Sequence, residues 1–258
     1  MSRTTDIDFD LPPVQEVVCG VVFAPLQHLK TAHMGLVWGL FGEEFPKTED
    51  MLPIGHRTPE GTRIDPRPRV WFVSEDDQRI IQVQLDRFHF NWRKVGDDDP
   101  YPRFESVYAA FTRHYAAFRD LIRTTEEVVP EHLELTYVNI LPQGPGLPDA
   151  LAGLFPDLVR SVDDRRYLPR PRGFQWTSTY DLAGVPAPLR ITATTVTRGG
   201  DAPRPAIKLE LTVGGPVTPP DGAELDAWFD AAHEAIVRGF VDITAGETQR
   251  EVWKRRAP

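Results

Sequence analysis

The sequence contains a single cysteine, Cys19, in 258 residues. It therefore has no intramolecular disulfide and no metal cluster built on cysteine ligands, which suits a reducing compartment. Cys19 lies inside the apolar run VVCGVVF. This position favours a small core residue, because reactive thiols lie in exposed, electropositive surroundings.

Long apolar runs are also lacking, since VVCGVVF is among the longest and a membrane-spanning helix needs about 20 apolar residues. The first residues, MSRTTDIDFDLPP, carry acids and prolines where a signal peptide has a basic start and an apolar stretch. We therefore expect no membrane contact and a cytoplasmic location.

Familiar catalytic and cofactor motifs are missing from the sequence. HExxH, GxGxxG, GxxxxGK and GxSxG do not occur, and the seven histidines are scattered. We accordingly predict no metal site and no cofactor. The net charge of −9 argues against indiscriminate nucleic-acid binding, although a local basic face is compatible with an acidic chain.

Hydrophobic patterning predicts seven strands and three long helices. The predicted strands are Gln15–Ala24, Arg69–Ser74, Arg79–Lys94, His132–Leu141, Phe174–Leu182, Leu189–Arg198 and Ala206–Val213. The predicted helices are Leu29–Phe45, Tyr101–Thr124 and Ala223–Ile243, with a weaker one at Asp149–Val159. This order indicates an α+β protein, with one or more antiparallel sheets of about seven strands covered by three long helices.

Two similar segments, PRPRVWF and PRPRGFQW, each close a long arginine-bearing loop and open a strand. With the shared order of strand, variable segment, antiparallel strands and long helix, they indicate a duplicated strand-helix-hairpin-helix unit. We predict one module over residues 1–258, with repeat halves at 14–125 and 131–245. Short Pro-Arg repeats also arise by chance, so a chain without duplication remains open.

Several stretches in a fixed order carry a family resemblance. They are LPPVQEVVCGVVF, VQLDRFHFNWRK followed by YPRFESVYAAF, ELTYVNIL, and AHEAIVRGFVDIT ahead of Trp253. Across nearly the whole chain they resemble an uncharacterised, sporadically distributed bacterial protein family of about 250 residues. The resemblance implies a complete single-module protein. It brings no activity, substrate or site residue with it.

The predicted strand from Arg79 to Lys94 changes its apolar face halfway. Ile81 and Val83 alternate on one face, whereas Phe88 and later aromatic residues fall on the other. A regular strand with one buried side cannot do this. We therefore predict either a bulge near Asp86 or a strand that crosses from one core to another.

This irregularity gives the first candidate ligand-binding residues, which are Asp86, Arg87, His89, Asn91 and Asn139. In a polar pocket His89 could exchange a proton while Arg87 holds an anion, so these two are also the candidate catalytic residues. The alternative is structural. Arg87 then pairs with Asp86 or a neighbouring acid, Asn91 caps a turn, His89 lies half exposed, and Asn139 satisfies backbone groups at a strand end.

Two arginine-rich loops form the second candidate, an anion-binding face. They carry nine arginines, Arg57, Arg63, Arg67, Arg69, Arg160, Arg165, Arg166, Arg170 and Arg172. The guanidinium fork suits phosphate and carboxylate, and the candidates are Arg67, Arg69, Arg170 and Arg172. The alternative is that acids within each loop neutralise these charges.

Three functions follow from these features. The favoured one is a non-catalytic binding or protein-interaction module, an accessory component of a bacterial locus, with a protein partner or a small anionic ligand. The second is a hydrolase- or isomerase-type enzyme acting on an anionic small molecule. The third, which is not favoured, is nucleic-acid or nucleotide binding through the arginine loops. A homodimer is compatible with each of them.

Overall fold

The computed structural model describes residues 7–58, 61–63, 67–142, 154–155, 173–198, 204–217 and 222–256. Nine strands form one antiparallel sheet, and β3 (His56–Thr58) pairs with β4 (Gly61–Arg63) in a separate two-stranded sheet. The predicted α+β class is confirmed. The order along the large sheet is β2 (Lys47–Met51), β5 (Arg69–Val73), β6 (Arg79–Gln84), β7 (Arg87–Arg93), β1 (Val14–Phe23), β8 (Pro130–Pro142), β11 (Arg204–Pro216), β10 (Leu189–Arg198) and β9 (Gln175–Tyr180).

The large sheet has nine strands, and the prediction of about seven was therefore wrong. One added strand is β2, at the sheet edge, where the polar sequence KTEDM shows no apolar alternation. Edge strands need only one hydrogen-bonded neighbour, and charges on them discourage further pairing. The other added strand comes from division of the segment 79–94 into β6 and β7.

Division of this segment explains the change of apolar face. Residues 85 and 86 are a turn, and Gln84 pairs with Arg87 across it. Paired residues of neighbouring strands point to the same side of a sheet. Phe88 therefore returns to the face of Val83, its partner in the register. The predicted bulge or crossing strand is wrong, and a tight hairpin takes its place.

The helices are α1 (Met34–Phe41), α2 (Phe104–Ile122), α4 (Gly222–Ile243) and α5 (Gly246–Glu251), with a 3-10 turn at Thr31–His33. The two long helices lie close to the predicted bounds. The first predicted helix was too long, because α1 has 8 residues, two of them glycines, which weaken a helix. The weak helix predicted at 149–159 lies outside the described residues, except for 154 and 155.

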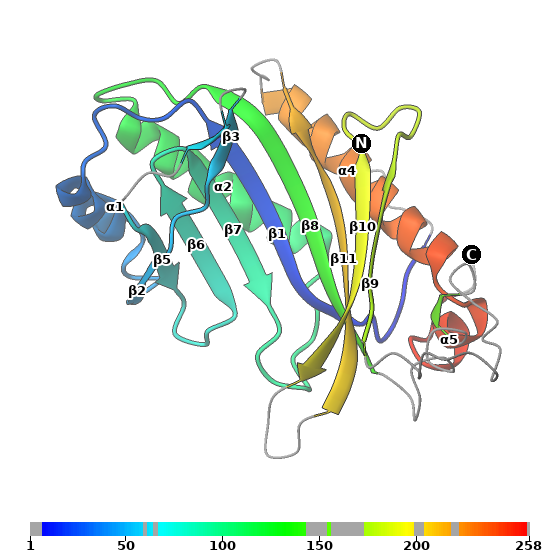
Figure 1. Cartoon of the computed structure of the whole chain (residues 1–258). Helices are drawn as coiled ribbons and strands as arrows, with labels where there is room; N and C mark the ends of the chain where they lie inside the picture. Colours follow the sequence, from blue (N-terminus) through cyan, green and yellow to red (C-terminus); the bar gives the residue numbers. More distant parts are fainter. Residues whose placement is uncertain are drawn as a thin grey trace. The chain divides into compact units, whose positions relative to one another are not determined.

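By its contacts the chain divides into two compact units. The first unit comprises Glu16–Leu135 and Gly214–Leu225. In it α2 lies against one face of β7 and β1 (Figure 1), and Phe41 of α1 packs on Phe72 of β5. Aromatic rings fill this interface, with Phe88 at 5.3 Å from Phe118 and 5.6 Å from Tyr115 between ring centroids. This is the apolar face of the first unit.

The second unit comprises Met1–Gln15, Thr136–Val213 and Asp226–Pro258. Its strands β9, β10 and β11 form an antiparallel meander, and α4 packs on them (Figure 1). The helix approaches closely at Gly239, where a Cβ atom would lie 2.7 Å from Leu189 Cδ2. Near the ends of the chain, Phe9 bridges to Arg255 and its ring packs 5.8 Å from that of Phe240.

None of the helices in the described ranges is long and apolar enough to cross a membrane. The predicted single module and its repeat halves, 14–125 and 131–245, stay predictions.

Candidate functional site

The other face of the first unit's strands carries polar side chains. We call it the polar sheet face and define it by Arg69 and Trp71 of β5, Gln82 and Gln84 of β6, and Arg87, His89 and Asn91 of β7. The register pairs Trp71 with Gln82, Gln82 with His89, and Gln84 with Arg87. The predicted trio Arg87, His89 and Asn91 therefore does project from one face.

The part of this face on β6 and β7 is buried. Arg87 and His89 are each 6% exposed and Asn91 is 3% exposed, so the alternative that His89 lies half exposed is wrong. The chain segment before β3 crosses over Gln84, which exchanges hydrogen bonds with the backbone of Ile54. The Ile54 N–H donates to Oε1 at 2.8 Å, and Nε2 donates to the Ile54 carbonyl at 2.9 Å. Buried polar groups need such partners.

Arg87 has a full carboxylate partner in Asp86. Its Nε donates to Oδ1 at 3.0 Å and its terminal nitrogen to Oδ2 at 3.2 Å. Gln84 Nε2 donates to the same Oδ1 at 3.1 Å. The pairing expected in the structural alternative is therefore present, and the charge of Arg87 is compensated.

A chain of hydrogen bonds crosses four strands of the polar sheet face. An Arg69 terminal nitrogen donates to Gln82 Oε1 at 2.7 Å, and Gln82 Nε2 donates to Asn91 Oδ1 at 2.8 Å. Asn91 Nδ2 then donates to Glu16 Oε1 at 2.6 Å. Asn91 thus links neighbouring strands and caps no turn. This chain fixes the orientation of both amides.

His89 lies over Gly20, its partner on β1. A Cβ atom at Gly20 would lie 2.7 Å from His89 Cδ2 and 2.9 Å from Nε2, so only glycine leaves room for the ring. Burial, followed by the charges of Arg87 and Arg69, lowers the pKa of His89 to about 3. No hydrogen-bond partner meets its buried Nε2 within the described part of the chain.

Arg69 and Trp71 each have a buried nitrogen that resembles His89 Nε2 in lacking a hydrogen-bond partner among the described residues. Arg69 Nε and Trp71 Nε1 are buried and have no hydrogen-bond partner in the ranges that the structure describes. Both groups are N–H donors. The Arg69 guanidinium lies 5.5 Å from the centroid of the Trp71 ring. Burial and the positive charge of Arg87 lower the pKa of Arg69.

Arg67 lies at a different place from Arg69. Its guanidinium donates to the Leu29 carbonyl at 2.7 Å and lines a groove of about 300 Å³ with Trp38, Val70 and Phe72. Val70 and Phe72 alternate with Trp71, so their side chains point to the opposite face. The two predicted anion-binding residues of the first loop are thus separated. Arg170 and Arg172 lie outside the described residues.

Asn139 belongs to the second unit, on β8. Its side chain is 3% exposed, and Nδ2 donates to the Leu209 carbonyl on β11 at 3.3 Å. It therefore satisfies a backbone group of a neighbouring strand, as the structural alternative expects.

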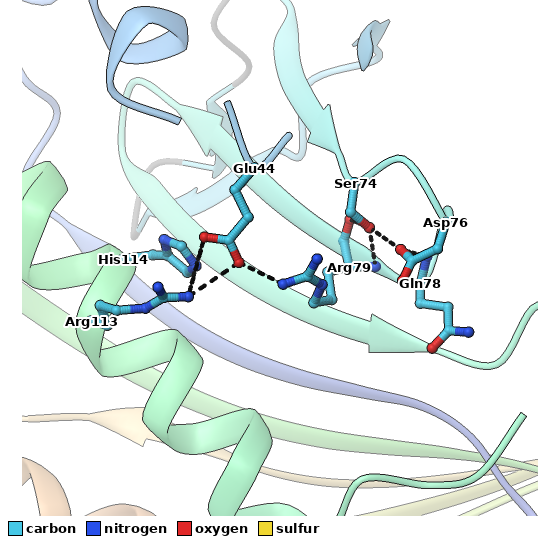
Figure 2. Close-up of polar contacts among 7 residues, drawn as sticks. All are labelled: Glu44, Ser74, Asp76, Gln78, Arg79, Arg113 and His114. Carbon is cyan, nitrogen blue, oxygen red and sulfur yellow. Dashed lines mark hydrogen bonds and ion pairs between the residues drawn. The ribbon is translucent and has the colours of Figure 1, made fainter. Parts of the chain in front are cut away.

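Sequence reasoning missed a charged cluster around Glu44, just after α1. Figure 2 shows the Glu44 carboxylate between Arg79 of β6 and the neighbouring Arg113 and His114 of α2. His114 Nε2 lies 3.6 Å from Glu44 Oε2 and 3.0 Å from an Arg113 nitrogen. Residues far apart in sequence form this cluster, and no spacing could have revealed it.

His114 is held by rings as well as charges. It stacks on Phe90 at 5.6 Å and meets Phe45 edge-on at 5.1 Å. Burial lowers its pKa to about 4, against the opposing influence of Glu44, and Arg113 and Arg79 lower it further. A surface cavity of about 420 Å³ opens beside it. Each charged group drawn here has a partner, which favours a structural role.

Helix α1 exposes apolar residues. Leu36, Trp38 and Leu40 are 60%, 47% and 42% exposed. A helix that is apolar on all sides is normally buried. Neighbouring exposed apolar residues of this kind are uncommon on the surface of a monomeric protein.

Groups of histidine, cysteine and acidic side chains able to hold a metal ion do not occur among the residues described. Cys19 is buried, and burial raises the pKa of its thiol. No protein-family model matches the chain, and comparison with curated proteins found no match either. Any function must therefore be argued from the geometry.

Proposed function

We propose that the protein is a non-catalytic binding module that holds a small anionic ligand on the polar sheet face. The observation that carries this proposal is Arg69. Its guanidinium is half-buried beside a second arginine, and it contacts no carboxylate in the described ranges. Partial removal of a charge from water without a counterion is unfavourable. An anion that accepts from Arg69 Nε and Trp71 Nε1 would remove that cost.

The state of His89 supports binding over catalysis. A general acid or base works best with a pKa near the operating pH. With its pKa lowered to about 3, His89 is neutral at neutral pH and is a weak base there. Arg87 is already paired with Asp86, so it is not the anion clamp that the enzyme alternative needs. Neither candidate residue therefore favours the hydrolase or isomerase alternative over binding.

Calorimetric titration of the full chain with sodium acetate tests the proposal. Arg69→Gln removes the charge and keeps a group able to hydrogen-bond Gln82. We expect it to weaken acetate binding about 10- to 100-fold, since a hydrogen bond to a charged group contributes about 1.5–3 kcal/mol. Trp71→Phe keeps the ring and removes one donor, so we expect a smaller loss.

The matched control is Arg190→Gln, which removes an exposed arginine from β10 in the second unit. Acetate binding should not change in this variant. The proposal fails if acetate and inorganic phosphate both show no saturable binding to the wild-type chain. It fails equally if Arg190→Gln weakens acetate binding as much as Arg69→Gln does.

The architecture supports a second proposal, that the chain is a duplicated unit. Each half begins with one strand, β1 or β8, and continues with an antiparallel meander, β5-β6-β7 or β9-β10-β11. Each meander precedes a long helix, α2 or α4. In the strand order the last strand of each meander adjoins the half's own first strand. Membership in the resembling bacterial family and a cytoplasmic location stay proposals of the same kind.

A further inference from the structure

We infer that the polar sheet face binds a monoanion of the carboxylate class in preference to a dianion such as hydrogen phosphate. This inference rests on the proposed anion site. The inference comes from the charges that the described residues place around Arg69. It predicts a preference that mere attraction to arginine would not give, because simple attraction grows with the charge of the anion.

The charges carried by the residues that define the polar sheet face and by the turn at residues 85 and 86 sum to one positive charge. Arg69 and Arg87 are cations, and Asp86 is the only buried carboxylate among the described residues of this face and its turn. Asp86 binds Arg87 through both oxygens, so the surplus charge resides on Arg69. A monoanion beside Arg69 makes the site neutral. A dianion would leave one negative charge uncompensated beside the buried Arg69 Nε and Trp71 Nε1, and such a charge is costly.

The remaining groups around Arg69 are neutral. Gln82, Asn91 and Trp71 carry no charge, and His89 is deprotonated well above its pKa of about 3. Two acids lie on other strands of the sheet, β1 and β2. Glu16 ends the chain of hydrogen bonds at Asn91, and Glu49, the partner of Trp71 on the edge strand β2, is exposed. Both acids oppose a second negative charge on the ligand.

The donors also suit a planar acceptor group. Arg69 uses one terminal nitrogen for Gln82, which leaves its Nε edge for another partner. An arginine fork matches the two oxygens of a carboxylate. Trp71 Nε1 supplies a further N–H from the same strand and the same face.

Inorganic phosphate provides the test, because one molecule can be offered as a monoanion or a dianion. The wild-type chain is titrated calorimetrically at constant ionic strength on both sides of the second pKa of phosphate. We expect the dianionic form to bind at least about tenfold more weakly. Acetate, a monoanion on both sides, should bind equally at the two pH values, which controls for titration of the protein.

Two variants separate charge from shape. Asp86→Asn raises the charge of the site by one, and we expect it to shift the preference towards dianionic phosphate. Asp86→Asn combined with Arg87→Gln restores the single positive charge and should restore the preference for the monoanion. If the single variant does not fold, the wild-type phosphate titration and the double variant still decide the question.

The outcomes distinguish the two levels of the argument. Dianionic phosphate binding as tightly as the monoanion, with both lost in Arg69→Gln, would overturn the monoanion preference and leave the anion site standing. Absence of saturable binding by acetate and by both forms of phosphate would overturn the anion site itself.

Discussion

Phe88 and His89 are neighbours in β7, and both side chains are buried, but they lie on opposite faces of the sheet. On the apolar face, Phe88 packs against rings of α2. On the polar sheet face, His89, Trp71 and Arg69 each keep a nitrogen without a partner in the described ranges. Native proteins seldom leave buried polar atoms unsatisfied, and each exception asks for an explanation.

The comparison teaches that burial alone does not reveal what a face does. The apolar face consists mainly of packed rings, and its histidine, His114, is stacked on Phe90 and hydrogen-bonded to Arg113. Among the described residues of this face, the Tyr115 hydroxyl is a buried polar atom without a hydrogen-bond partner. The polar sheet face has more donors than acceptors. We therefore expect stability to depend mainly on the apolar face and anion binding on the polar one.

Acid should produce the largest loss of stability, because three buried histidines have lowered pKa values. His89 and His114 lie on the two faces of the first unit's sheet, and His233 lies in α4. The pKa values of His89, His114 and His233 are lowered from 6.5 to about 3, 4 and 4 respectively, chiefly by burial. Below pH 6.5 these histidines bind protons in the unfolded chain but not in the folded chain. The free energy of unfolding should therefore decrease as the pH falls, approaching about 4 kcal/mol per pH unit near pH 5.

Urea denaturation across this pH range measures the slope. His89→Gln and His114→Gln should each reduce it by about 1.4 kcal/mol per pH unit, one proton each. A slope that neither variant changes would show that these imidazoles are protonated in the folded chain, contrary to their burial.

The next effect separates the two faces directly. Phe88→Ala should lower the free energy of unfolding by about 3–5 kcal/mol, since it leaves a cavity among aromatic rings. His89→Leu, one residue away, removes a ring nitrogen without a partner and keeps much of the volume. We expect a loss below about 1.5 kcal/mol. Equal losses in urea denaturation would contradict the division between the faces.

A smaller effect should appear at Gly20, which makes room for His89. Gly20→Ala places a methyl group within 2.9 Å of two ring atoms and should cost about 1–3 kcal/mol. Gly35→Ala is the matched control, because nothing lies within 4 Å of a Cβ there and alanine favours the helix. His89→Ala should rescue Gly20→Ala. Lack of rescue would place the strain elsewhere.

Much of the fold was readable from periodicity. The two long helices and strands such as β1, β10 and β11 followed from apolar spacing, because each has a buried face of regular period. The edge strand β2 was missed, since its side chains are largely exposed and its sequence is polar. The hairpin at Asp86 was missed, because the change of apolar face that a turn of two residues produces is also typical of a bulge or a crossing strand.

The candidate site was predicted in part. Alternation correctly placed Arg87, His89 and Asn91 on one face, and the arginine count included Arg69. Nothing in the sequence indicated that Gln82 and Trp71 belong with them. The pairing of Arg87 with Asp86 was one of the alternatives that the sequence left open. The Glu44 cluster, which joins residues 35 and 69 positions apart, was equally invisible.

The sequence alone therefore determined the α+β class, the buried periodic elements and the side of β7 on which its polar residues lie, because these depend on residues close together in the chain. Only the tertiary structure decided which charges are paired. Pairing depends on strand register and on covering segments, such as Ile54 over Gln84, that bring distant residues together. Arg87 and Arg69 look alike in sequence, yet only Arg87 has a carboxylate partner among the described residues.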